Sequence, residues 1–272
     1  MTRVGFIGLG EQGKSMAVNL ATGGFDLMVH DLRADPMTEL AALGAKVAQT
    51  PAEIAAHAEI VEIIVVDDAQ VEAVVLGDRG VLANAPPGTI VAIHSTIHPA
   101  TVRKLADRAV ARGVIVSDAA VSGGPHGART RTLCYMIGGS THAVERCRPL
   151  FETSGNAKTI FHVGNVGAGM TAKLAHQVII SLNILAAHEG MLLGEKAGVD
   201  LTMLQEIVRA GGAQSRIADN WVRHRPPALT GRLFFKDLAL ALECAHELGL
   251  ALPGAAMTQQ LIEKLLGRNQ GA

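Results

Sequence analysis

A glycine-rich turn near the N-terminus places the strongest constraint on the fold of this chain. Residues 3–8 form an apolar segment that predicts a β-strand, and the pattern Gly8-Leu-Gly10-Glu-Gln-Gly13 leads from it directly into a helical run at 14–20. In this setting the first glycine permits a tight turn, the second lets a pyrophosphate approach the backbone, and the third lets helix and strand pack closely. The N–H groups at the start of the helix would face the phosphates. The pattern therefore predicts a Rossmann-type unit that binds a dinucleotide.

The acid that such a unit needs stands at the end of the next predicted strand. Residues 25–30 are apolar and extended, and Asp31 follows them, 21 positions after Gly10. A carboxylate at this place accepts hydrogen bonds from the ribose hydroxyls of the adenosine and repels a 2′-phosphate. Arg33 would bind that phosphate if its side chain turned inward. We therefore expect NAD as the preferred cofactor, with NADP as the alternative.

Alternating strands and helices fill the rest of the first half. The apolar strands are continuous rather than alternating, which is typical of a parallel, doubly wound sheet that is buried on both faces. In such a sheet ligands bind beyond the carboxyl ends of the strands, so Asp67, Ser95, Thr96 and the turn Ser122-Gly123-Gly124 are expected near one crevice. The predicted strands are 46–48, 60–66, 89–94, 114–118, 133–137 and 159–163, and the predicted helices are 36–43, 51–57, 70–76, 99–112 and 141–151.

The bare backbone of Ser122-Gly123-Gly124 would direct N–H groups at an anion, although an ordinary surface turn has the same composition.

Strand patterns stop at Gly164, and only helical patterns follow. The chain is thus expected to divide into a dinucleotide-binding Rossmann domain (1–163) and an all-helical domain (164–272) for substrate binding and dimerisation. A long interdomain helix at about 169–196 would open the second domain and span ~40 Å. Polar residues inside this helix argue against a membrane span. The further predicted helices are 201–208, 214–224, 233–248 and 254–266.

Lys173 is the unusual residue of the long helix. It lies near the predicted N-terminus in an otherwise apolar run, with Gln177 one turn further on the same face and His176 beside it. Burying an amine costs desolvation energy, and perturbed ionisable groups gather at catalytic sites. A lysine that extends from a core helix to solvent produces the same pattern. From these residues alone both interpretations stay open.

Composition excludes several classes of function. The 272 residues carry 24 basic and 25 acidic side chains with no basic run, so nucleic-acid and membrane-surface partners have no electrostatic support. The first residues enter a strand without a signal-peptide pattern, and Cys134, Cys147 and Cys244 have no metal or redox spacing. We expect a cytoplasmic protein without a bound metal. The apolar helical half favours a homodimer or homotetramer.

Four segments in this order resemble the motifs of one family. They are Val4–Gly10, Asp118–Gly124, Gly164–Gln177 and Lys236-Asp237-Leu238. Over nearly its whole length the chain resembles the β-hydroxyacid dehydrogenases, the group of 3-hydroxyisobutyrate dehydrogenase and tartronate semialdehyde reductase. The resemblance implies an NAD(P)-dependent oxidoreductase that interconverts a small 3-hydroxyacid and its semialdehyde or oxo acid.

The resemblance also implies roles for individual residues. Lys173 would be the general acid/base, Ser122, Gly123 and Gly124 would hold the substrate carboxylate, and Gln177 would orient the substrate. The residues expected to bind the cofactor are Gly8, Leu9, Gly10, Gln12, Gly13, Asp31, Arg33, Val65, Val66, Gln70, Thr96 and Lys236.

Several positions depart from the family pattern, and two alternatives remain. Ala120 and Val66 replace usual prolines, a usual glycine is replaced near Arg131, and His94, His98 and His126 bring imidazoles to the expected crevice. These changes leave the substrate undetermined. The related imine reductases are one alternative, but they generally carry an acid or a tyrosine where this chain has its lysine. A non-catalytic dinucleotide-binding module is the other, and the intact lysine and serine–glycine motifs argue against it.

Overall fold

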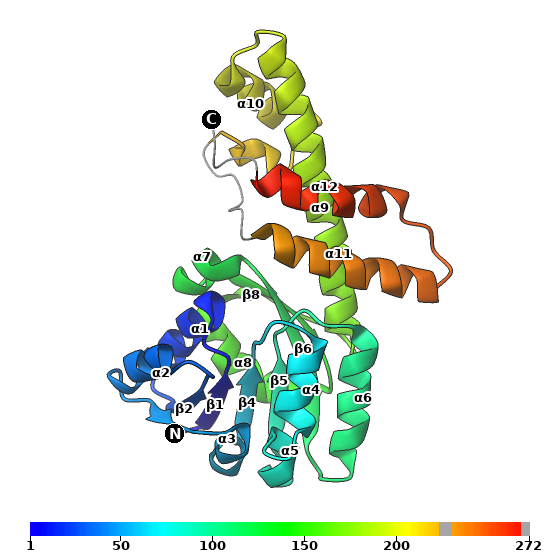
Figure 1. Cartoon of the computed structure of the whole chain (residues 1–272). Coiled ribbons are helices and arrows are strands. Elements are labelled where there is room, and N and C mark those ends of the chain that lie inside the picture. The colour runs from blue at the N-terminus through cyan, green and yellow to red at the C-terminus, as the bar shows by residue number, and fades with distance from the viewer. Residues whose placement is uncertain (223–229, 268–272) are drawn as a thin grey trace. The chain divides into compact units, whose positions relative to one another are not determined.

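The computed structural model describes residues 1–222 and 230–267 and divides into two compact units (Figure 1). The first unit is Met1–Lys173 and the second is Leu174–Ala272. Strands occur in the first unit, and the described part of the second unit is helical.

An eight-stranded sheet forms the centre of the first unit, in the order β3-β2-β1-β4-β5-β6-β7-β8. All neighbouring strands are parallel except β6 and β7, which are antiparallel. This one pair departs from the parallel arrangement predicted for the sheet, because the connection 123–132 is shorter than the dozen or so residues of a parallel crossover. The strands are β1 (Arg3–Ile7), β2 (Asp26–His30), β3 (Lys46–Val47), β4 (Ile60–Ile63), β5 (Ile90–Ile93), β6 (Ile115–Ser122), β7 (Leu133–Gly138) and β8 (Gly155–Gly164).

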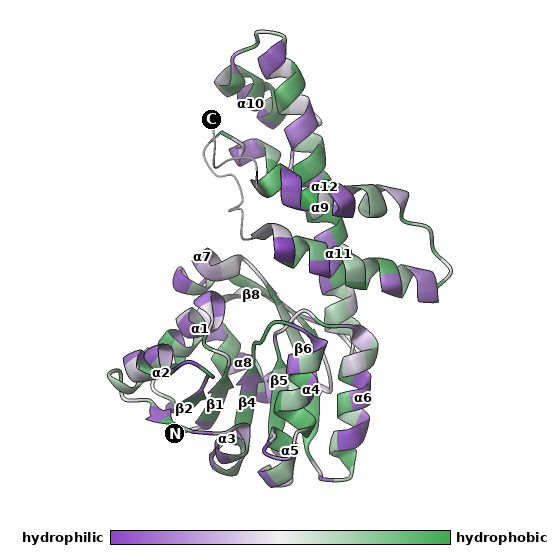
Figure 2. Cartoon of the chain, in the orientation of Figure 1, coloured by the Kyte–Doolittle hydropathy of each residue, from purple (hydrophilic) through white to green (hydrophobic). Residues whose placement is uncertain are grey.

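Helices cover both faces of this sheet, which confirms the doubly wound architecture (Figure 1). One core contains Phe6 and Phe151, and the core on the opposite face contains Ile63 and Leu105, all with 2% exposure or less. Helix α6 is amphipathic: its hydrophobic residues pack into the core, and its hydrophilic residues lie on the other side of the helix (Figure 2). The helices of the first core are α1 (Glu11–Thr22), α2 (Ala34–Ala41), α7 (Gly124–Arg129) and α8 (Thr141–Ser154); those of the second are α3 (Pro51–His57), α4 (Asp68–Leu76), α5 (Val81–Asn84) and α6 (Pro99–Val110).

Two further predictions about the strands need correction. β4 ends at Ile63 rather than at residue 66, because the N–H groups of Val65 and Val66 leave the ladder: the first donates to the Ser95 hydroxyl at 2.7 Å and the second to Gln70 Oε1 at 3.1 Å. β6 runs past the predicted end at 118 as far as Ser122, since β7 pairs with this additional length.

The second unit begins within a long helix, α9 (Ala168–Lys196), close to the predicted span. It continues with α10 (Leu201–Ala210), a 3₁₀ turn η1 (Ala218–Asn220), α11 (Thr230–Glu247) and α12 (Pro253–Gly267). Two small cores hold these elements, one around Ile184 and Phe234 and the other around Met191 and Trp221. By length and composition alone α9 would also pass for a membrane span, a test that core helices of soluble proteins pass as well.

The helix predicted at 214–224 is wrong over its described part. Within residues 214–222 the backbone forms the short 3₁₀ turn η1 in place of an α-helix, and polar side chains bond to the backbone around it: Arg209 Nε donates to Asp219 O at 2.8 Å, and Ser215 Oγ accepts from Ala218 N–H at 3.1 Å. Residues 223 and 224 lie outside the described residues.

The assembly of the chain into a homodimer or homotetramer stays a prediction. The exposed large apolar side chains of α9 and α10 are Ile179, Leu192, Leu193, Met203 and Ile207.

Candidate functional site

The three glycines of the first turn have different surroundings, and each fits its position for a different structural reason. Gly8 adopts φ +97°, and a Cβ there would lie 2.1 Å from Ile64 O. A Cβ on Gly13 would lie 2.1 Å from Gly8 O, so helix α1 packs on the turn at a distance that only glycine allows. Gly10 is exposed, and a Cβ there would meet nothing within 4 Å. The turn thus has a closely packed base and an open side at Gly10, which fits the approach of a pyrophosphate.

Asp31 ties the loop after β2 to this turn. Its Oδ2 accepts a hydrogen bond from Leu9 N–H at 2.6 Å, and its Oδ1 accepts from the Arg33 N–H at 2.8 Å and from Arg33 Nε at 3.1 Å. Arg33 Nη2 also donates to Leu9 O at 2.8 Å. Burial raises the pKa of Asp31, but the hydrogen bonds from Arg33 and Leu9 outweigh it and lower the pKa overall. The carboxylate is therefore ionised at neutral pH.

The loops after β4 and β5 meet at the same edge of the sheet, because these two strands are parallel neighbours. The Ser95 hydroxyl accepts from Val65 N–H, and Val66, with 55% exposure, is held by Gln70. Gln70 N–H in turn donates to Asp67 Oδ1 at 2.9 Å, so Asp67 caps α4. Thr96 follows Ser95 and is partly exposed. These residues therefore lie in the loops beyond the carboxyl ends of β4 and β5, where the sequence predicted them.

The serine–glycine turn stands at the end of β6. Gly123 and Gly124 have φ values of +130° and +60°, which favour glycine, and a Cβ on Gly124 would face open space. The short helix α7 starts within the predicted turn. Gln12, at the start of α1, is partly buried, and its Nε2 is a buried atom without a hydrogen-bond partner.

Lys173 lies on α9, and its side chain is 7% exposed. Burial raises the pKa of the Cys134 thiol, whereas the positive charge of Lys173 lowers it. Cys134 is the cross-strand partner of Ser122 in the pairing of β6 and β7. The amine therefore acts electrostatically at the strand position beside Ser122, so the first unit brings these two predicted site residues into one region.

His94 does not lie at the crevice, contrary to the prediction. It is 2% exposed, its Nδ1 hydrogen-bonds to Ala119 O at 2.7 Å, and its Nε2 lies 3.5 Å from Glu62 Oε1. The rings of Tyr135 and Phe151 meet it edge-on, with centroids 6.0 and 5.8 Å away. The residue directly after a strand can still point into the core, because side chains alternate between the two faces. The sequence analysis did not single out the buried Glu62, although an acidic residue within an apolar strand segment is unusual and could have been noted.

Gln177 and Lys236 belong to the second unit and share a partner there. Gln177 Nε2 donates to Asp237 Oδ2 at 2.6 Å, and Lys236 Nζ lies 2.9 Å from Asp237 Oδ1. His176 Nδ1 lies 3.3 Å from Gln177 Oε1. Asp237 is 5% exposed and was not among the predicted site residues, although it stands next to Lys236 in the fourth motif.

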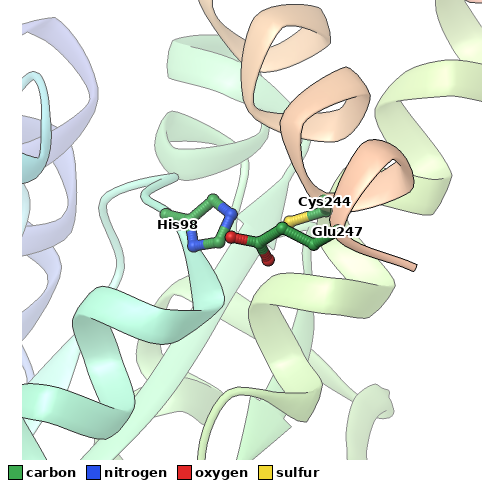
Figure 3. Close-up of side chains that lie close together, drawn as sticks. All are labelled: His98, Cys244 and Glu247. Atoms are coloured by element: carbon green, nitrogen blue, oxygen red, sulfur yellow. The ribbon is translucent and has the colours of Figure 1, made fainter. Parts of the chain in front are cut away.

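Three further side chains with ionisable or metal-ligating groups are drawn in Figure 3. In the first unit His98 is the cap of α6: its N–H donates to Asp68 Oδ1 at 2.9 Å, and its Nδ1 accepts from Ala100 N–H at 3.2 Å. In the second unit Cys244 and Glu247 stand three positions apart on α11, near its C-terminal end (Figure 3).

A closely packed glycine turn, an acid after β2 and the strand order of the sheet define a nicotinamide-dinucleotide-binding protein. Residues 3–164 match the family model described as the NAD-binding domain of 6-phosphogluconate dehydrogenase. Residues 167–272 match the family model described as NAD-binding of NADP-dependent 3-hydroxyisobutyrate dehydrogenase. The chain belongs to the 3-hydroxyisobutyrate dehydrogenase, or β-hydroxyacid dehydrogenase, family. It is an oxidoreductase that acts on the CH–OH group of small hydroxyacids with NAD or NADP.

Named relatives align over most of their length. The NAD-dependent L-serine dehydrogenase of Pseudomonas aeruginosa is 36% identical, with 98% of this chain and 93% of the relative covered. The 2-hydroxy-3-oxopropionate reductase of Escherichia coli is 38% identical, with 95% and 89% covered. Among solved structures, 3-hydroxyisobutyrate dehydrogenase of Mycobacterium tuberculosis with L-serine has a TM-score of 0.86 at 27% identity, with 98% and 94% covered.

Proposed function

We propose that this protein is an NAD-preferring dehydrogenase of a small 3-hydroxyacid, with Lys173 as the general acid/base. One observation carries the proposal: an almost fully buried lysine, Lys173, whose positive charge acts at Cys134, the strand partner of Ser122. A buried amine beside a turn of bare backbone N–H groups suits a substrate that has a carboxylate and a neighbouring hydroxyl group.

Proton transfer is the chemistry that this chain supplies. A bound nicotinamide would supply the hydride acceptor for oxidation at the carbon that bears the hydroxyl group, and the hydride donor for the reverse reaction. In oxidation the neutral amine of Lys173 takes the proton of the substrate hydroxyl as the C=O bond forms. In reduction its ammonium group donates that proton to the carbonyl oxygen. The N–H groups of Gly123 and Gly124 and the hydroxyl of Ser122 hold the carboxylate, which fixes the reacting carbon.

The preference for NAD rests on Asp31 and Arg33. The Asp31 carboxylate is ionised at the place where the adenosine ribose binds in this fold. Arg33, the cation that would bind a 2′-phosphate, is engaged by Asp31 and by Leu9 O. Binding of NADP would bring a phosphate beside the carboxylate and would break these contacts, so we expect NAD to bind more tightly.

The remaining predicted roles are part of the same proposal. Val65, Val66, Gln70 and Thr96 belong to the loops after β4 and β5 and would line the nicotinamide side. Gln177 and Lys236 belong to the second unit, and their roles towards substrate and cofactor stay predictions.

The imine reductase alternative has weaker support. An imine reductase of Myxococcus stipitatus has a TM-score of 0.70 but only 18% identity, which shows a common fold alone. Lys173 favours carbonyl and hydroxyl chemistry.

A substrate panel tests the proposal. Purified protein is assayed by NADH absorbance with L-serine, 3-hydroxyisobutyrate and 2-(hydroxymethyl)glutarate in the oxidative direction, and with 2-hydroxy-3-oxopropionate in the reductive direction. Lactate, which lacks a 3-hydroxyl group, is the matched control. We expect turnover of at least one 3-hydroxy compound and much slower oxidation of lactate. Reduction of cyclic imines without turnover of any panel member would overturn the proposal.

A further inference from the structure

The start of helix α9 is held by a buried carboxylate from a distant strand. Asp118 lies in the middle of β6, with no exposed surface, between Ile93 of β5 and Gly138 of β7. Its Oδ1 accepts a hydrogen bond from Gly167 N–H and its Oδ2 from Met170 N–H, both at 2.7 Å. The first N–H groups of a helix have no partner within the helix, so a side chain has to supply one. Here both oxygens of one carboxylate do so, which fixes the position and the direction of the helix start.

Two glycines make this approach feasible. A Cβ on Gly138 would lie 2.5 Å from Asp118 Oδ1, and a Cβ on Gly169 would lie 2.8 Å from Asp118 Oδ2 and 2.5 Å from Met136 O. Any larger residue at either position would push α9 away from the sheet. The neighbouring Ser117 hydroxyl donates to Gly138 O at 2.8 Å, a bond that involves neither the Asp118 carboxylate nor α9. The carboxylate therefore sits in a socket whose size is set by the backbone.

The same carboxylate connects the two predicted parts of the active site. Lys173 stands three positions after Met170 on α9, and Ser122 stands four positions after Asp118 on β6. A shift of the helix start along the sheet would therefore move the amine relative to the serine–glycine turn. A misplacement of about 1 Å can cost ~10²-fold in rate.

We propose that Asp118 is a positioning residue for the reaction, which sets the place of the Lys173 amine through the first turn of α9. This inference rests on the proposed role of Lys173 as general acid/base.

The electrostatics of the socket agree with a positioning role. Burial raises the pKa of Asp118 above its ordinary value, although the N–H groups of Gly167, Met170 and Gly169 lower it. The ionised form is thus less stable in the folded protein than in water, so the charge does not serve stability. Replacing the carboxylate by an amide removes this cost together with one acceptor, so we expect Asp118→Asn to fold.

Two variants and one matched control test the proposal. Asp118→Asn keeps the shape of the side chain but loses one acceptor for the helix start. Gly169→Ala keeps the carboxylate but places a methyl group between the helix start and Asp118 Oδ2, and it carries the test alone if Asp118→Asn does not fold. Ser117→Ala is the control: it removes a buried hydrogen bond from the adjacent residue of the same strand without touching α9.

We expect both test variants to lower kcat by about 10–10²-fold, with KM for the hydroxyacid and the Kd for NADH within about threefold of wild type. Ser117→Ala is expected to keep kcat within about twofold, even where its melting temperature falls as much as that of Asp118→Asn. Equal effects of all three variants on kcat, or an unchanged kcat in Asp118→Asn, would overturn the proposal.

The double variant Lys173→Met/Asp118→Asn separates this inference from the proposed function. Measurements use enough enzyme to read turnover ~10⁴-fold below wild type. If Asp118 acts through the amine, adding Asp118→Asn to Lys173→Met lowers kcat by less than about twofold. A full additional loss would show that Asp118 acts independently of Lys173. An unchanged kcat in Lys173→Met alone would instead refute the proposed function.

Discussion

Gly13 and Gly10 of the dinucleotide turn should respond to alanine in opposite ways. In Gly13→Ala the new Cβ would lie 2.1 Å from Gly8 O and 2.6 Å from Ile64 Cγ2. The carbonyl oxygen belongs to the backbone of the turn and cannot rotate away, so α1 has to move from the sheet. Such overpacking costs about 1–3 kcal/mol. For a unit of this size we expect the melting temperature to fall by roughly 2–12 °C.

Gly10→Ala should leave stability almost unchanged. The residue has φ −62°, which alanine adopts readily, and its Cβ would meet nothing within 4 Å. Alanine gains a few tenths of a kcal/mol by restricting the unfolded chain and loses about as much at this N-cap position. If a pyrophosphate approaches the backbone here, however, the methyl group occupies part of its space. NADH affinity should therefore fall by at least about tenfold, or ~1.4 kcal/mol.

Thermal unfolding and a fluorescence titration with NADH, applied to both variants, separate the two effects. An unchanged NADH affinity in Gly10→Ala would refute the assignment of this turn to the pyrophosphate. A Gly13→Ala variant as stable as wild type would show that α1 adjusts without cost.

Two other substitutions test local arguments. Asp31→Asn should narrow the proposed preference for NAD over NADP, measured as the ratio of kcat/KM values, because it removes the charge that we expect to repel the 2′-phosphate. A tenfold preference of the wild type for NADPH would contradict this. Since hydrogen bonds lower the pKa of Asp31, its ionised form stabilises the fold above the ordinary carboxyl pKa, and this contribution is lost as the pH falls. Arg131, at φ +57°, is strained as a non-glycine residue. Arg131→Gly should be about 1 kcal/mol more stable than Arg131→Ala in denaturant unfolding, because both lose the bonds to Asn19 and Thr22 but only glycine relieves the strain. Equal stability of the two variants would show that the backbone there is not strained.

Local sequence signals predicted most of the first unit correctly. Apolar runs and glycines fix strands and turns through steric rules that act over a few residues, and the ends of β1, α1 and β2 lie at most three residues from their expected positions. The roles expected for Gly8, Gly10 and Gly13 agree with the clearances around them.

Long-range pairing was the part that sequence could not supply. The antiparallel β7 depends on the length of a connection, and the burial of His94 depends on which face its side chain takes. The bonds from Asp118 to the start of α9 join residues 49 and 52 positions apart, and no local pattern reports them. In the sequence, Asp118 was noted only as the first residue of the motif Asp118–Gly124.

The kinetics of Lys173→Met and His176→Gln test the central claim most directly. Methionine keeps the helix and most of the side-chain volume but removes the amine. General acid/base groups contribute about 10²–10⁴-fold, so kcat should fall by that factor. NADH binding should barely change, because we assign the binding of the dinucleotide to the Gly8–Gly13 turn and Asp31. His176 is the rival proton donor, since its unperturbed pKa suits proton transfer near neutral pH.

We predict that His176→Gln keeps kcat within about threefold of wild type, whereas Lys173→Met loses at least about 10²-fold under the same conditions. An inactive His176→Gln beside a fully active Lys173→Met would contradict the account and would assign the proton transfer to the imidazole.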